Sequence, residues 1–495
     1  MYYLGIDLGS SSVKIALVAA ETGVQKMVVQ EPEEEMPMIA LHKGWAEQNP
    51  EDWWNYVCKG IKKILSQSGC DPKTILGIGI AYQMHGLVLI DNQGAVLRNS
   101  IIWCDSRAVA IGEQAYGGIG KETCKNHLLN APGNFTASKL KWVQENEPAV
   151  YSQIYKCMLP GDFIAFRLSQ QASTTVSGLS EGIFWDFKEQ DISTAILDYY
   201  GFDRSLFPDL VATFGVQGKV TAMGSEASGL AKGTPILYRA GDQPNNALAL
   251  NVFNAGEVAA TGGTSGVMYA ISNTLKTNVY DRINNFAHVN HGLQDSTSIG
   301  KLVCINGAGI QYRWLLNNLS ISSYDTMNKM AQSVPVGSDD LVLLPFGNGA
   351  ERLLGNKNLG ARMLHIDLNR HDQGHLCRAA LEGIAFAFVY GFELLKEDDV
   401  VPKVIRAGND NLFRSQLFSN TIASLLMEPI AIHNTTGAVG AARACTIAAN
   451  GLEHFAGFTK NDHLETFEPQ KNTEAYTLAY MRWKKELNKQ LNNEI

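Results

Sequence analysis

The sequence predicts an α/β protein made of two similar halves. Residues 1–18 and residues 256–271 each read as a strand, a short turn of Gly, Ser or Thr, and a second strand. The two segments lie about half a chain apart, and apolar strands alternate with helical stretches around them. This alternation is typical of α/β folds, and the repetition indicates a duplicated architecture whose halves face each other across a ligand.

The turn of the first segment has the composition of an anion site. Gly9 and three serines leave room for backbone N–H groups and short hydroxyls to contact a bound anion. The serines are Ser10, Ser11 and Ser12. Asp7 precedes the turn, where a carboxylate can hold a divalent cation beside a polyphosphate, and Lys14 adds a positive charge. An ordinary hairpin explains these residues equally well, but the second turn, residues 262–266, favours a nucleotide site.

Composition bounds the class of protein. The 495 residues suffice for two or more domains, and a 45% hydrophobic, 18% charged composition is ordinary for a globular protein. The net charge of -8 argues against broad binding of nucleic acid or anionic membranes. There is no P-loop sequence and no apolar run near the roughly 18 residues of a membrane span, and we expect no signal peptide. The eight cysteines form no C-x-x-C pair, so we expect reduced thiols in a cytoplasmic protein.

Local signals predict the elements between and after the hairpins. Asn49 is suited to cap a helix and Pro50 to its first turn, so a helix is expected over residues 50–65. Further helices are expected at residues 135–147, 159–169, 308–319, 370–395, 413–426 and 437–450, and from Glu474 onward. Further strands are expected at residues 75–82, 87–91, 96–102, 219–221, 235–240, 301–305, 339–346, 402–408 and 429–433.

Two neighbouring strand ends carry polar clusters. The strand ending near residue 82 is followed by Met84 and His85, and the next one is followed by Asp105 and Arg107. Ligands collect at strand ends in open α/β sheets. Donors and acceptors beside apolar side chains match the hydroxyls and C–H faces of a sugar, so these four residues are candidate sugar contacts. A histidine at a strand end is, however, more often structural.

A third carboxylate follows a strand in the segment AGDQPNN. Asp242 comes after Gly241 at the end of an apolar strand, and the amide Gln243 stands beside it. Such a carboxylate can orient a substrate hydroxyl and take its proton during phosphoryl transfer, which otherwise needs mainly positioning and charge neutralisation. The alternative is an aspartate that caps the following helix.

The motifs and their order along the chain resemble those of the FGGY carbohydrate kinases, and among them the xylulokinases. The similarity spans nearly the full length, and the joint order of the motifs is specific. The matching segments are IDLGSSSVK, GWAEQNPEDWW, QMHG, WCDSRA, FTASKLKWVQEN, AGDQPNN, GGTSG, NGAGIQ and GAVGAA.

The resemblance implies two actin/hexokinase-like (ribonuclease H-like) ATPase domains with a cleft between them, expected at residues 1–246 and 247–495. It implies ATP with Mg²⁺ as cofactors and a sugar as acceptor. Asp242 would be the base and Asp7 the metal carboxylate. Carried over motif by motif, the sugar site would be lined by Met84, His85, Asp105, Arg107, Asp242 and Gln243. The nucleotide would contact Ser10, Ser11, Ser12, Lys14, Gly263, Thr264, Gly307, Gln311, Gly408 and Asn411.

The expected reaction is the phosphorylation of D-xylulose to D-xylulose 5-phosphate. Ribulose, fuculose, gluconate or glycerol is the alternative acceptor, because Cys104 and Gln243 depart from the family pattern at the sugar site. GNDNLF also replaces the family's glycine-rich adenosine loop. A non-catalytic, nucleotide-gated sugar-binding protein is the hypothesis from another class. A homodimer is common in kinases of this type.

Overall fold

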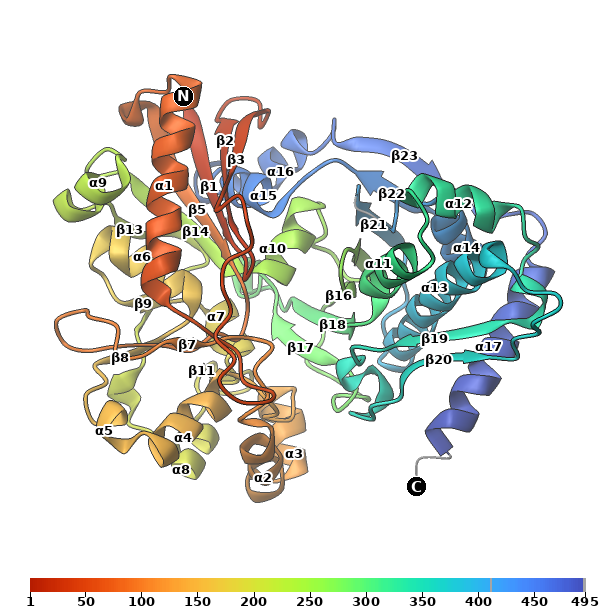
Figure 1. The fold of residues 1–495 in the computed structure, drawn as a ribbon. Helices are drawn as coiled ribbons and strands as arrows, with labels where there is room; N and C mark the ends of the chain where they lie inside the picture. The colour runs from red at the N-terminus through yellow and green to blue at the C-terminus, as the bar shows by residue number, and fades with distance from the viewer. Residues whose placement is uncertain (410–411, 493–495) are drawn as a thin grey trace.

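The computed structural model describes residues 1–409 and 412–492, which form two α/β lobes (Figure 1). The first lobe is built on a six-stranded sheet in the order β13-β14-β5-β1-β2-β3. These strands are β1 (Tyr2–Leu8), β2 (Val13–Ala19), β3 (Gln25–Glu31), β5 (Ile75–Tyr82), β13 (Phe214–Lys219) and β14 (Pro235–Gly241). Strands β1, β2 and β3 are antiparallel, β5 is parallel to β1, and β14 is parallel to β5.

The second lobe repeats this topology. Its seven-stranded sheet has the order β17-β18-β16-β15-β21-β22-β23. The strands are β15 (Glu257–Gly262), β16 (Gly266–Ser272), β17 (Asn284–Ala287), β18 (Ile299–Ile305), β21 (Val404–Gly408), β22 (Ile430–His433) and β23 (His463–Phe467). Strands β15, β16 and β18 form an antiparallel meander, and β21 and β22 add in parallel. The predicted duplication of an α/β unit is therefore confirmed.

The remaining elements cover the sheets or extend the lobes. The helices of the first half are α1 (Pro50–Ser68), α2 (Val109–Ile119), α3 (Lys121–Thr123), α4 (Thr136–Asn146), α5 (Pro148–Tyr151), α6 (Pro160–Ser169), α7 (Val176–Glu181), α8 (Thr194–Tyr200), α9 (Ala222–Ser228) and α10 (Asp242–Ala249). Its short strands are β4 (Glu47–Gln48), β6 (Val88–Ile90), β7 (Ser100–Ile101), β8 (Lys156–Met158), β9 (Ser173–Thr174), β10 (Trp185–Asp186), β11 (Asp191–Ile192) and β12 (Asp209–Leu210). The second half adds α11 (Ala308–Asn318), α12 (Tyr324–Gln332), β19 (Val342–Phe346), β20 (Gly360–Leu364), α13 (Gln373–Glu397), α14 (Gln416–Leu426), α15 (Gly437–Ala444), α16 (Ile447–Phe458) and α17 (Glu474–Asn492). Among the residues described, none of the helices combines the length and apolarity that crossing a membrane requires.

Local signals predicted most of these elements. Helix α1 begins where expected, because the Asn49 side chain accepts a hydrogen bond from the backbone N–H of Glu51 at 3.1 Å. The strand predicted over residues 96–102 is mostly wrong, since only β7 forms there. Arg98 holds this stretch instead, through ion pairs with Glu47 and, at 3.2 Å, with Glu147.

Helix α15 comes from the second half of the chain but packs on the first sheet. It contacts β1, β5 and β2, with α10 beside it, so both helices lie between the two lobes (Figure 1). Glycines allow this approach: a Cβ on Gly5 would overlap the carbonyl oxygen of Ala438, and a Cβ on Gly79 would overlap that of Ala441. Backbone therefore packs directly on backbone at this contact.

We expect Gly79→Ala to destabilise the protein, because the added methyl group meets a helix carbonyl that cannot move alone. Overpacking of this kind costs about 1–3 kcal/mol, measurable by urea unfolding. Gly117→Ala in α2 is the control, since an added Cβ there meets open space. It should be neutral or stabilise by up to about 1 kcal/mol. Equal stabilities for the two variants would contradict the packing argument.

Candidate active site

The hairpin between β1 and β2 presents unpaired backbone donors. The N–H groups of Ser10, Ser11 and Ser12 have no acceptor within the described chain. Their carbonyl groups, in contrast, are bound: the oxygen of Ser11 accepts from the Met36 N–H at 2.8 Å, and that of Ser12 from the Gly9 N–H at 3.0 Å. Successive free N–H groups can form an anion-binding concavity, and phosphate binding by the Ser10–Ser12 turn stays a prediction.

Asp7 lies between this hairpin and the start of α15. A Cβ on Gly437 would overlap its carboxylate, so a larger residue there would have to displace the Asp7 side chain. Lys14 is the register partner of Asp7 on β2, and its side chain is exposed. Burial raises the pKa of Asp7, and the charge of Lys14 opposes that rise.

Asp242 stands at the junction of β14 and α10. Burial and the neighbouring charge of Asp7 raise the pKa of Asp242 to about 7, although hydrogen bonds from Gln243 oppose the shift. The carboxyl group of Asp242 thus exchanges its proton close to neutral pH, which is the property required of a general base. The side chain is half-buried, as is that of Gln243.

Asp7 and Asp242 form the carboxylate pair to consider for a divalent cation. Within the described residues there is no group of three or more His, Cys, Asp or Glu side chains that could hold a metal. Mg²⁺ usually retains waters and takes one or two carboxylates together with substrate phosphates. Two carboxylates beside a hairpin with free N–H groups fit that mode of binding.

Met84 and His85 follow β5, and the Met84 side chain lies against Gly241, the residue before Asp242. His85 adopts a left-handed φ of 60°, and its Nδ1 shares a hydrogen bond of 2.9 Å with the carbonyl oxygen of Glu181. Its ring packs on Phe135 and Phe286. Burial, first, and the charge of Lys139 lower the pKa of His85 to about 3, so the imidazole is neutral at physiological pH.

Asp105 and Arg107 are bound to other protein groups. The Asp105 carboxylate accepts from the Ala46 N–H at 2.6 Å and forms an ion pair with Arg107 at 2.7 Å. Arg107 also pairs with Glu47 at 2.7 Å, and its guanidinium stacks 3.7 Å from the centroid of the Trp45 ring. Both side chains are buried and fix the loop that follows β7, and their contact with a sugar stays a prediction.

Two buried charged residues near this site were missed from the sequence. Glu181, at the end of α7, is 1% exposed, and neither of its carboxylate oxygens has a hydrogen bond within the described chain. A Cβ on Gly241 would overlap both Glu181 and Met84, which places the carboxyl group beside the residue before Asp242. Lys139 on α4 donates to the carbonyl oxygens of His85, at 2.8 Å, and Ile102. Lys139 belongs to the recognised FTASKL motif, whereas Glu181 lies in a run of small residues without any chemical signal.

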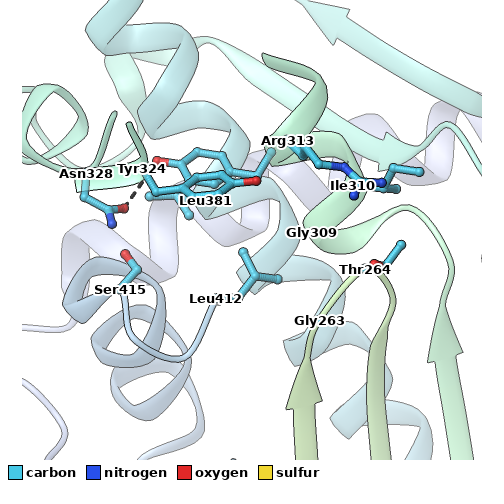
Figure 2. A pocket seen from close by; sticks show the side chains of 11 residues that line it. Gly263, Thr264, Gly309, Ile310, Arg313, Tyr324, Asn328, Leu381, Leu412 and Ser415 are labelled. Atoms are coloured by element: carbon cyan, nitrogen blue, oxygen red, sulfur yellow. Dashed lines mark hydrogen bonds between the residues drawn. The ribbon is translucent and has the colours of Figure 1, made fainter. Parts of the chain in front are cut away.

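A pocket in the second lobe lies against the second glycine-rich turn (Figure 2). It encloses about 440 Å³, including its open mouth. Its lining residues are Gly263, Thr264, Gly309, Ile310, Tyr312, Arg313, Tyr324, Asn328, Leu381, Leu412 and Ser415. The rings of Tyr312 and Tyr324 stack with centroids 5.8 Å apart, and the Tyr312 hydroxyl donates to Asn328 Oδ1 at 3.2 Å. Flat aromatic and apolar walls with a few polar groups suit a nucleobase and its ribose.

The pocket gathers some of the predicted nucleotide residues and omits others. Gly263 and Thr264 line it, and the Thr264 carbonyl accepts from the Ile310 N–H at 3.0 Å. Among the predicted nucleotide residues of the second half, Gly307, Gln311 and Gly408 lie outside the lining. A Cβ on Gly307 would overlap the Pro345 carbonyl, and Gln311 is buried. Asn411 lies outside the described residues.

The chain is similar to known proteins in sequence and in fold. The family model of the FGGY carbohydrate kinases, N-terminal domain, matches residues 2–249. A xylulose kinase of Bacillus subtilis is 28% identical over 80% of this chain and 78% of its own, and one of Escherichia coli is 27% identical over 90% of each. A structure described as a xyloylose kinase from Brucella ovis has a TM-score of 0.89 at 24% identity and covers 99% of both chains.

These comparisons confirm the predicted family and the two-domain actin/hexokinase-like fold. The family match extends over half of the chain and includes the first hairpin, the strand ends that precede Met84 and Asp105, and Asp242. The chain belongs to the FGGY family of carbohydrate kinases and is an ATP-dependent sugar kinase.

Proposed function

We propose that the chain transfers the γ-phosphoryl group of ATP to D-xylulose, giving D-xylulose 5-phosphate, with Asp242 as the general base. The observation that carries the proposal is the position of Asp242, at a strand end between Asp7 and the Met84–His85 loop, with a pKa raised to about 7 by burial and by Asp7. The relatives described as xylulose kinases support the choice of acceptor.

In the proposed reaction Asp242 removes the proton of the terminal hydroxyl of D-xylulose while the hydroxyl oxygen attacks the γ-phosphorus of ATP. The bond from the γ-phosphorus to the bridging oxygen breaks, ADP leaves, and the proton stays on Asp242. Backbone N–H groups of the Ser10–Ser12 turn and the Lys14 ammonium offset the charge on the transferring group. Mg²⁺, when bound with ATP and held by Asp7, would neutralise phosphate charge.

A neutral histidine and a buried carboxyl group lie near Asp242. His85 is neutral, because burial holds its pKa near 3. Burial and the charge of Asp242 raise the pKa of Glu181 well above its ordinary value. A neutral imidazole on this side of Asp242 suits a substrate that carries no charge, such as a sugar.

The second-lobe pocket would hold the adenosine of ATP. Ile310, Leu381 and Leu412 offer apolar surface for the base, and Gly263 and Thr264 join the pocket to the second glycine-rich turn. We also propose two domains that divide near residue 246 and a cytoplasmic homodimer. All eight cysteines are free thiols, which supports a reducing compartment.

The test of the acceptor is ADP release from ATP and Mg²⁺ with D-xylulose, L-xylulose, D- and L-ribulose, L-fuculose, gluconate and glycerol. We expect kcat/KM for D-xylulose to exceed the others by about tenfold or more. A stronger response to another member would reassign the acceptor and leave the chemistry in place. Release that no acceptor stimulates would contradict the proposed transfer.

Asp242→Asn should lower kcat by about 10²- to 10⁴-fold, because the amide cannot take the hydroxyl proton. Binding of AMP-PNP, measured by calorimetry, should persist, since the adenosine pocket lies in the other lobe. Asp209→Asn, an exposed aspartate on β12, is the matched control and should behave like the wild type. Near-normal turnover of Asp242→Asn would remove Asp242 from the role of base.

The pH profile follows from the raised pKa of Asp242, which burial and the charge of Asp7 bring to about 7. The base is ionised above that value, so kcat/KM should rise about tenfold per pH unit below pH 7 and level off above it. Thermal melting at each pH separates this effect from unfolding. An acidic limb centred near pH 4, the ordinary range of an aspartate, would show that the environment does not shift this group.

A further inference from the structure

The amide of Gln48 joins the two ends of the reaction site within the first lobe. Its Oε1 accepts hydrogen bonds from Trp53 Nε1 at 3.1 Å and from Gln83 Nε2 at 3.2 Å. Its Nε2 donates to the carbonyl oxygen of Ser10 at 2.6 Å and to that of Pro37 at 3.4 Å. Two donors on one side and two carbonyls on the other fix the orientation of this amide, which is 2% exposed.

One arm of this network ends in the phosphate hairpin. A trans peptide unit directs its C=O and the following N–H to opposite sides. By holding the Ser10 carbonyl inward, Gln48 turns the N–H of Ser11 outward, where it lacks an acceptor within the described residues. The orientation of the Ser11 N–H, a candidate donor to phosphate, therefore depends on Gln48, which donates to the Ser10 carbonyl and not to the ligand.

The other arm ends at the acceptor side. Gln83 is 2% exposed and directly precedes the Met84–His85 pair. Its backbone N–H donates to the Leu8 carbonyl at 2.7 Å, just before the phosphate hairpin. Two hydrogen-bonded connections therefore link Gln83 to the hairpin. One runs through the backbone of Leu8, and the other runs through the Gln48 amide.

We propose that Gln48 is a positioning residue that couples ATP binding to acceptor binding, an inference that rests on the proposed kinase reaction. When the acceptor orders the residues after Gln83, the Gln48 amide orders the Ser10–Ser11 peptide, and bound phosphate acts in the reverse direction. Such coupling is reciprocal, because each ligand changes the affinity for the other by the same factor.

The experiment measures the Kd of Mg²⁺–AMP-PNP by calorimetry, without and with saturating D-xylulose. In the wild type the sugar should tighten nucleotide binding several-fold, within the roughly 5- to 150-fold range typical of coupled sites. Gln48→Leu should bring the ratio of the two Kd values close to 1. Gln48→Glu keeps the acceptor oxygens and loses the donor to Ser10, so it should lose coupling too, and it serves if Gln48→Leu does not fold.

Gln217→Leu is the matched control for removing a buried glutamine. Gln217 is 3% exposed and its amide donates to the carbonyl oxygens of Ala212, at 2.8 Å, and Thr213, at 3.0 Å, away from the site. It should keep the wild-type ratio even if its melting temperature falls. Gln83→Leu should lose coupling without adding to the loss from Gln48→Leu, since both cut one connection.

The outcomes separate this inference from the proposed function. If wild-type protein binds neither AMP-PNP nor D-xylulose, the proposed function fails and this inference fails with it. If it binds both, and Gln48→Leu keeps the wild-type ratio or the wild type shows no coupling, the role of Gln48 is overturned while the kinase reaction stands. Equal losses in Gln48→Leu and Gln217→Leu would mean a general effect of stability and would also overturn it.

Discussion

The close packing of α15 on the first sheet is the constraint on which the site depends. Because Gly5 and Gly79 lack side chains, the helix backbone reaches the strands and its first residue, Gly437, lies against Asp7. The carbonyl of Gly437 accepts a hydrogen bond of 3.0 Å from Asn245, three residues after Asp242. The two carboxylates are thus brought together by backbone packing of a helix from the distant C-terminal part, which overrides their mutual repulsion.

This enforced proximity raises the proton affinity of the proposed base. Burial and the neighbouring Asp7 charge raise the pKa of Asp242 to about 7, and burial with the Asp242 charge keeps the pKa of Glu181 high. Burial also lowers the pKa of Lys139 to about 7, so desolvation disfavours the charged form of both acids and bases in this region. Environments that separate the proton affinities of similar groups divide the roles of acid and base between them.

The fold and part of the site could be predicted from the sequence. What could not be predicted has a physical reason. Hairpins and capped helices are set by near neighbours, so the Ser10–Ser12 turn, the Asn49 cap and Asp242 at a strand end could be located. Which side chains face a ligand depends on contacts from far along the chain. Arg107 illustrates this, because the Trp45 ring and the Glu47 carboxylate already occupy its guanidinium.

The pocket of the second lobe shows the same limit, since its walls come from the turn at Gly263 and Thr264, from α11, α12 and α13, and from the segment 412–415. Arg352, also in the second lobe, donates to the Ala131 carbonyl of the first at 2.8 Å and lies 5.2 Å from the Phe135 ring. Phe135 in turn packs on His85. Because Arg352 donates to a backbone carbonyl, the geometry of this hydrogen bond depends on the relative position of the two lobes. It does not depend on the side chain at residue 131. A shift of the second lobe would therefore be transmitted to Phe135 and His85 through this contact, independently of the Gln48 amide, which lies within one lobe.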